Sequence, residues 1–159
     1  MNIVLYRVYP QQTDFVPVGD VAGAGRAWLE QQLPDCSVTW ECYEHPHFLH
    51  SGDAFVRVRC PFCGQELDTR DWQDMMELVY SASAFRELGI ASPCCGGQTT
   101  LNRLTYSTHC AFASCCYTVK PLNASTTPLP DRETMEQCLK GLTATVPSPE
   151  GWGLVAEEH

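Results

Sequence analysis

Two short cysteine motifs constrain most strongly what this chain can fold into. The first reads Cys60-Pro61-Phe62-Cys63-Gly64 and the second reads Pro93-Cys94-Cys95-Gly96-Gly97. A thiol pair two residues apart and closed by glycine is typical of the turn by which a chain wraps a tetrahedral metal ion, and four thiolates satisfy one Zn²⁺ at about 2.3 Å each. Together the motifs predict a structural Zn²⁺ site whose ligands are Cys60, Cys63, Cys94 and Cys95.

The second motif departs from the first in one position. In the same frame, Ser92 stands where the first ligand belongs, so either Cys94 and Cys95 both bind or one binds and His109 or Cys110 supplies the fourth ligand. Free cysteine is also among the most buried residue types, and in a competing interpretation the second pair is part of the core and the first pair an ordinary turn. Four thiolates suit iron as well as zinc, so the sequence leaves the metal open between these two.

Length and charge limit the classes of protein to consider. The chain has 159 residues, 44% of them hydrophobic, which predicts a single domain over 1–159 with a zinc-binding element formed by 58–65 and 92–98. Ten Lys and Arg residues face nineteen Asp and Glu residues, for a net charge of −9. Proteins that bind nucleic acid or anionic membranes need clustered basic residues, so the charge argues against both kinds of partner.

The N-terminal segment does not resemble a signal peptide. Arg7 interrupts its apolar run and no small-residue cleavage site follows. No apolar stretch approaches the roughly 20 residues that span a bilayer. We therefore expect a cytoplasmic protein with reduced cysteines, in which the glycosylation sequon at Asn123-Ala124-Ser125 has no role.

Hydrophobic periodicity predicts an α+β fold, in which a small, mainly antiparallel sheet packs against two or three helices and is clipped by a zinc-ribbon-like pair of knuckles. Asp68 or Thr69 is a candidate cap for the second helix. A hairpin through His109 to Ala111 would join the last two predicted strands, and the tail after Pro147 shows no clear pattern. The predicted helices cover 20–33, 71–88 and 131–142, and the predicted strands cover 3–9, 37–43, 55–60, 99–108 and 112–120.

Three histidines form the only histidine cluster of the sequence, at His45, His47 and His50. Three imidazoles this close can make a metal site or a general base, but no carboxylate or nucleophile nearby completes a catalytic set. Turn-forming residues surround them, which favours a polar loop between two strands. The cysteines outside the two motifs are predicted to belong mostly to the core, with one of Cys115 and Cys116 facing inward and the other outward.

The order of motifs Cys60-Pro-x-Cys-Gly64, Pro93-Cys94-Cys95-Gly96 and Leu101-Asn102-x-Leu104-x-Tyr106 resembles a group of uncharacterised bacterial zinc-ribbon-like proteins, most clearly over residues 54–121. Both adjacent cysteines recur in that group, so the resemblance implies that Cys94 and Cys95 bind together and that Cys110, Cys115 and Cys116 are not ligands. No activity is established for the group. In this strand Leu101 and Tyr106 would lie on opposite faces, and Asn102 would brace the preceding knuckle.

These observations favour a non-enzymatic zinc-stabilised module that binds a protein partner or acts as an accessory factor. Homo-oligomerisation is not readable from the sequence. The alternative is an enzyme, either a thiol oxidoreductase using Cys94 and Cys95 or a zinc hydrolase using His45, His47 or His50. A metal sensor or carrier is a third possibility, which would hold its zinc weakly.

Overall fold

The computed structural model describes residues 2–123 and 126–159. Two residues of the glycosylation sequon, Ala124 and Ser125, lie outside the described residues. In the described part of the chain, no helix is long and apolar enough to cross a membrane.

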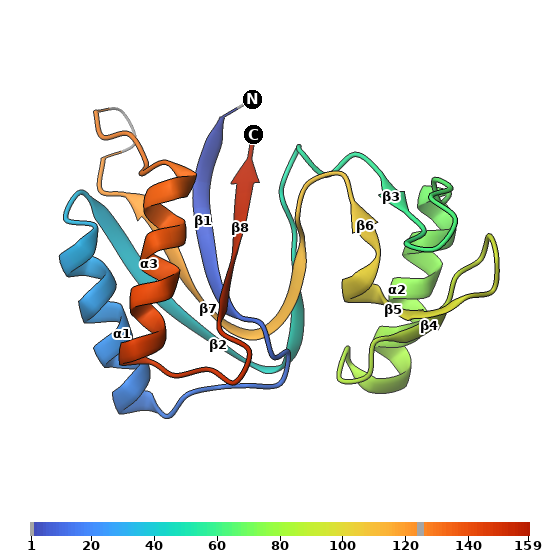
Figure 1. Cartoon of the computed structure of the whole chain (residues 1–159), viewed down its shortest axis with the longest axis horizontal. Coiled ribbons are helices and arrows are strands. Elements are labelled where there is room, and N and C mark those ends of the chain that lie inside the picture. The colour runs from blue at the N-terminus through green and yellow to red at the C-terminus, as the bar shows by residue number, and fades with distance from the viewer. Residues whose placement is uncertain (1, 124–125) are drawn as a thin grey trace.

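A four-stranded antiparallel sheet forms the larger part of the molecule. Its strands are β1 (Ile3–Pro10), β2 (Cys36–Leu49), β7 (Ala111–Pro121) and β8 (Trp152–Glu158), in the order β2-β7-β1-β8. Every neighbouring pair is antiparallel. Helices α1 (Gly19–Gln32) and α3 (Arg132–Thr145) lie together on one face of this sheet (Figure 1). The predicted α+β fold is confirmed.

The main core lies between these two helices and the sheet. Its buried residues come from both layers: Tyr6, Val8, Leu29, Val38, Tyr117, Val119, Met135, Leu142 and Val146. The polar atoms of its aromatic residues are satisfied, since Tyr117 Oη donates to the carbonyl of Ala22 at 2.7 Å and Trp152 Nε1 donates to the carbonyl of Val146 at 2.8 Å. A buried hydroxyl or indole N–H without a partner would destabilise the fold, so these bonds fix how the helices sit on the sheet.

Between β2 and β7 the chain leaves the sheet and builds a second unit, here called the cysteine lobe (residues 58–106), seen at the right of Figure 1. Two pairs of very short strands, β3 with β6 and β4 with β5, surround helix α2. The lobe has its own apolar cluster, which Phe48 and Phe112 from β2 and β7 join. Its elements are β3 (Val58–Arg59), α2 (Thr69–Ser83), β4 (Gly89–Ala91), β5 (Gln98–Thr100), the 3₁₀ helix η1 (Leu101–Arg103) and β6 (Thr105–Tyr106).

A large bulge in β2 interrupts its pairing with β7. Cys42 pairs with Cys115 and His47 pairs with Ala113, so four residues of β2 oppose the single Ser114 of β7. Extra residues in one strand bend it and increase its twist. His45 and His47 therefore lie within a strand, and the predicted loop is wrong for both; only His50 follows the strand.

The sheet curls so far that the segment after β2 returns to the opposite edge strand. The amide of Glu158 donates to the carbonyl of Ser51 at 3.0 Å, and the amide of Asp53 donates to the carbonyl of Glu158 at 2.7 Å. A parallel bridge joins Gly52 to Glu158. One end of the sheet is thus closed on itself, which leaves the end of β8 without a free edge.

Several sequence expectations need correction in the lobe. The strand predicted over 55–60 has only two residues, and Val56, which would share a buried face with Val58, is 64% exposed. The strand predicted over 99–108 is interrupted by η1, where Leu101 is fully buried and its carbonyl accepts a hydrogen bond from Tyr106 Oη at 2.7 Å. Leu101 and Tyr106 thus pack together rather than on opposite faces.

The other differences concern strand pairing, the end of α2 and the burial of two cysteines. The predicted hairpin through 109–111 is wrong, because β7 pairs with β1 and β2 while β6 pairs with β3. The helix expected to reach 88 ends at Ser83, where Ala84 adopts a left-handed conformation, and the tail forms β8. Cys115 and Cys116 are both buried, since Cys115 donates to the Phe15 carbonyl and Cys116 lies beside Tyr43 inside the curl.

Candidate metal centre

The first cysteine motif forms a tight turn directly after β3. The amide of Cys60 donates to the carbonyl of Gln65 at 2.9 Å, and the amide of Gly64 donates back to the carbonyl of Cys60 at 3.0 Å. Gly64 has a φ of +73°, a backbone conformation that residues other than glycine rarely adopt. The turn therefore places Cys60 at its base, with Cys63 three residues further on.

The second motif forms the same turn between β4 and β5. The amide of Ser92 donates to the carbonyl of Gly97 at 2.9 Å, the amide of Gly96 donates to the carbonyl of Ser92 at 2.8 Å, and Gly96 also has a φ of +73°. These bonds repeat those of the first turn position by position. Ser92 thus corresponds to Cys60 and Cys95 corresponds to Cys63, whereas Cys94 occupies the place that Phe62 has in the first turn.

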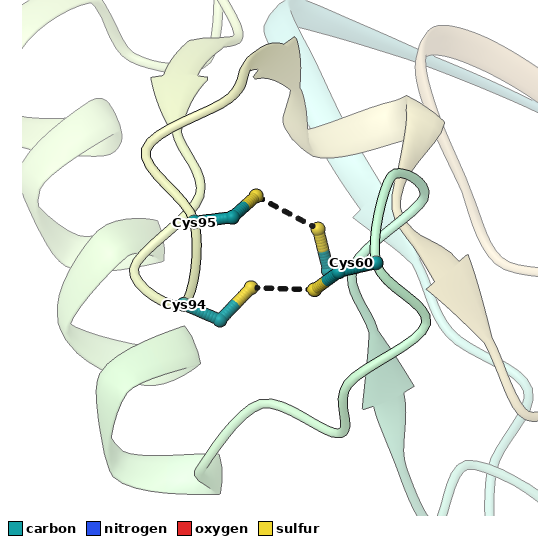
Figure 2. A group of neighbouring side chains, drawn as sticks. Cys60, Cys94 and Cys95 are labelled. Atoms are coloured by element: carbon teal, nitrogen blue, oxygen red, sulfur yellow. Dashed lines mark hydrogen bonds between the residues drawn. The ribbon is translucent and has the colours of Figure 1, made fainter.

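The two turns bring all four predicted ligands together. Their sulfur atoms all lie within 4.8 Å of one another, with Cys60 Sγ 3.7 Å from Cys95 Sγ and Cys63 Sγ 3.3 Å from Cys94 Sγ. Figure 2 shows Cys94 and Cys95 directed from one turn toward Cys60 on the other. Thiolates around a tetrahedral Zn²⁺ are about 3.8 Å apart, given bonds of about 2.3 Å. The group could therefore hold a metal ion, and its donor set fits one.

His109 and Cys110, the alternative sources of a fourth ligand, lie outside this group. His109 Nε2 is 2.5 Å from Tyr9 Oη, and Cys110 Sγ is 3.5 Å from the hydroxyl of Ser51. Cys110 is buried, and this burial raises the pKa of its thiol. The structure thus brings Cys94 and Cys95 to the first pair and keeps both alternatives elsewhere.

The surroundings of the first turn shift the pKa values of its two cysteines in opposite directions. The hydroxyl of Ser92, followed by the amides of Cys63 and Phe62, lowers the pKa of Cys60 to about 6. The amide of Gln65 favours ionisation of Cys63, but the neighbouring Cys94 and Cys60 outweigh it and raise the pKa of Cys63 to about 11. One thiolate is therefore stabilised at the expense of the next, and a bound cation would relieve the repulsion among four.

The histidine cluster is differently built. His47 stacks on Tyr43 with ring centroids 3.8 Å apart, His45 meets the edge of Tyr80, and His50 Nδ1 accepts a hydrogen bond from the amide of Gly52 at 3.0 Å. Burial, followed by the nearby His45, lowers the pKa of His47. Among the described residues, the four cysteines are the only group of three or more potential ligands close enough to share a metal ion.

The remaining cysteines are mostly core residues, as predicted. Cys42 differs, because its side chain is exposed. Burial raises the pKa of Cys115 to about 12, which leaves that thiol protonated and unreactive at neutral pH. The buried members of this set are Cys36, Cys110, Cys115, Cys116 and Cys138.

Sequence reasoning recognised Ser92 only as a missing ligand. Its hydroxyl is 3.2 Å from Cys94 Sγ and lowers the pKa of Cys60, and the residue is 1% exposed. Asn102, which was expected to brace the knuckle, instead accepts a hydrogen bond from Thr100 Oγ1 at 2.6 Å. The signal for Ser92 was the equal spacing of Ser92-Pro93-x-Cys95-Gly96 and Cys60-Pro61-x-Cys63-Gly64.

Comparison with known protein families, with curated proteins and with solved structures finds no match to this chain. The chemistry of the cysteine group and its place in the fold are what indicate a function.

Proposed function

We propose that this protein binds one Zn²⁺ through Cys60, Cys63, Cys94 and Cys95, and that the metal has a structural role. The observation that carries the proposal is the convergence of four sulfur atoms within 4.8 Å. Zinc is the common occupant of sites with four cysteine ligands. Such a site has no coordination position left for water, which favours a structural over a catalytic metal.

The architecture of the cysteine lobe supports a structural role for the ion. β3 and β6 have two residues each and β4 and β5 have three, too few for an independently stable sheet. One ligand pair follows β3 and the other lies between β4 and β5, so the metal would join both strand pairs. The free energy of metal binding would then contribute directly to folding of the lobe.

We further propose that the protein is a non-enzymatic interaction or accessory module whose partner is a protein. The net charge of −9 disfavours nucleic acid and anionic membranes. The cysteine lobe carries exposed apolar side chains, among them Phe62 in the first knuckle, 59% exposed, and Leu78 on α2, 72% exposed. Thiolate ligands require reducing conditions, which supports a cytoplasmic location.

Thiol oxidoreduction is the second candidate, favoured by the 3.3 Å separation of Cys63 Sγ and Cys94 Sγ. In this case the thiols would be free of metal and would lose two hydrogens reversibly on oxidation. Zinc hydrolysis at the histidine cluster has less support, because His47 stacks on Tyr43 and His45 packs against His47 and the edge of Tyr80.

The first experiment measures metal content per chain by elemental analysis, with native mass, on protein purified without chelator. We expect one zinc in the unaltered protein and in Cys42→Ser, whose exposed thiol lies outside the group. Cys95→Ser is expected to lose the metal and to unfold less cooperatively. Elemental analysis also separates zinc from iron.

Metal-free but folded wild-type protein would contradict the zinc proposal and favour oxidoreduction. Substrate turnover by the zinc-loaded protein, abolished in His47→Ala while the fold is retained, would overturn the non-enzymatic role.

A further inference from the structure

The second knuckle has a buried serine at the position that a ligand occupies in the first. Ser92 and Cys60 make equivalent backbone bonds, to Gly97 and Gln65 respectively, both at 2.9 Å. Both residues are buried, with exposures of 1% and 2%. Because the backbone of the two turns is the same, the side chain of Ser92 points into the site as that of Cys60 does.

The Ser92 hydroxyl contacts a sulfur atom of the site. It lies 3.2 Å from Cys94 Sγ. A metal-bound thiolate can only accept, so with metal in the site the hydroxyl would be the donor to Cys94. Donors of this kind orient the ligands of a metal and stabilise their charge.

Cys94 reaches the site from an unusual position. In the first turn this position is Phe62, whose amide donates to Cys60 Sγ at 3.4 Å. In the second turn Cys94 itself supplies the thiol, and no sulfur stands at the first position to receive an equivalent amide bond. The Ser92 hydroxyl fills the space this leaves and contacts the displaced sulfur.

We propose that Ser92 is a positioning residue of the metal centre: its hydroxyl takes the place of a ligand, and its hydrogen bond to Cys94 holds that sulfur in the arrangement that completes a four-thiolate site. This inference rests on the proposed zinc binding. The site is then a zinc-ribbon-like pair of knuckles in which one ligand lies two residues later than usual, at Cys94 instead of at position 92. The alternative is that Ser92 only fills space, which alanine would do equally well.

The test uses the full chain loaded with Co²⁺, whose thiolate charge-transfer absorption reports how many cysteines bind, and with Zn²⁺, whose transfer to a chelator gives a release rate. The variants are Ser92→Ala, the double variant Ser92→Cys/Cys94→Ala, and Ser81→Ala as a control on the exposed face of α2.

We expect Ser92→Ala to keep four thiolates and one metal but to release zinc about tenfold faster. An effect of this size is typical when a hydrogen-bond partner of a metal ligand is removed. The double variant restores a regular Cys-Pro-x-Cys knuckle and is expected to bind one metal with four thiolates. The control releases zinc at the wild-type rate.

An unchanged release rate in Ser92→Ala overturns the inference, as does a double variant that folds without binding metal. Neither result affects the zinc proposal. Conversely, a wild-type protein without four-thiolate Co²⁺ absorption removes the proposed function itself, so the two failures are distinguishable.

Discussion

Gly25 lies where helix α1 comes closest to the sheet. A β-carbon at this position would overlap Tyr117 Oη and would approach Val146 Cγ2 to 2.5 Å. Tyr117 Oη is held in place by its hydrogen bond to the carbonyl of Ala22, so it has no free direction in which to move. Glycine is needed here because α1 packs closely on the sheet, and not because the backbone adopts a conformation that favours glycine. This close packing explains why a residue that disfavours helices stands in one.

We predict that Gly25→Ala destabilises the protein by about 1–3 kcal/mol, the usual effect of overpacking a core. Gly23 in the same helix has nothing within 4 Å of the corresponding position. Gly23→Ala is therefore a matched control and is expected to stabilise by up to about 1 kcal/mol through helix propensity. Urea unfolding of both variants measures the difference, and equal effects of the two substitutions would refute the packing argument.

At the scale of elements, the cysteine lobe and the four-stranded sheet depend on different interactions. The sheet and its two helices share a large apolar core, whereas the lobe combines a smaller apolar cluster, short strands, one well-capped helix and the cysteine group. Asp68 caps α2 by accepting a hydrogen bond from the amide of Arg70 at 2.8 Å. A cap contributes about 1 kcal/mol, too little to order the lobe alone, so metal binding should decide its stability.

Removing the metal should therefore affect the lobe selectively. On chelation we expect the amides of α2, β4 and β5 to exchange hydrogen faster, while those of β1, β7 and β8 keep their protection. Hydrogen exchange followed by mass spectrometry measures this by segment. Adding zinc back should restore protection in wild-type protein but not in Cys95→Ser. Uniform loss of protection over the whole chain would show that the lobe is not an independent unit of stability.

At the scale of the whole molecule, the C-terminal strand closes the curled sheet with a group of charged residues. Arg7 forms an ion pair with Glu157, and His159 lies between Glu157 and Asp53, with its ring nitrogens 2.9 Å and 3.2 Å from their carboxylates. Burial opposes ionisation of Glu157, but the hydrogen bonds from His159 and Arg7 outweigh it and lower the pKa. The hydrogen bonds to Glu157 and then to Asp53 raise the pKa of His159.

These shifts predict opposite pH effects. The His159 contribution is present below its usual pKa near 6.5 and is lost as pH rises through the raised folded value. The Glu157 contribution is present above its usual pKa near 4.5 and is lost as pH falls through the lowered value. We expect His159→Gln to destabilise the protein at about pH 6 and to have little effect at about pH 9.

Denaturant unfolding of His159→Gln and wild-type protein across this range measures the difference. Because the cysteine group is the same in both proteins, its own pH dependence cancels. A difference that stays constant with pH would mean that the protonated imidazole does not contribute.

Much of the local structure follows from sequence patterns. β1, α1 and α3 lie within a few residues of their predicted bounds, because alternating or helical apolar periodicity and caps such as Asp131 act over short distances. The knuckle turn is local too, since proline, glycine and the thiol spacing act within five residues. Other features depend on residues far apart in the chain and cannot be predicted from a local pattern. They are the position of β7 between β2 and β1, the bulge in β2 and the pairing of β8 with β1.

The candidate metal centre divides in the same way. The sequence by itself determined the identity of the four thiols and the chemistry they share, because sulfur donors and knuckle turns are properties of short segments. It is the tertiary structure that brings both Cys94 and Cys95 to the first pair, places Ser92 at a ligand position, and sets His45 against the edge of Tyr80, outside the ligand group. These outcomes depend on how β3 and the β4–β5 hairpin are placed around α2, which is set by burial of the lobe's apolar side chains.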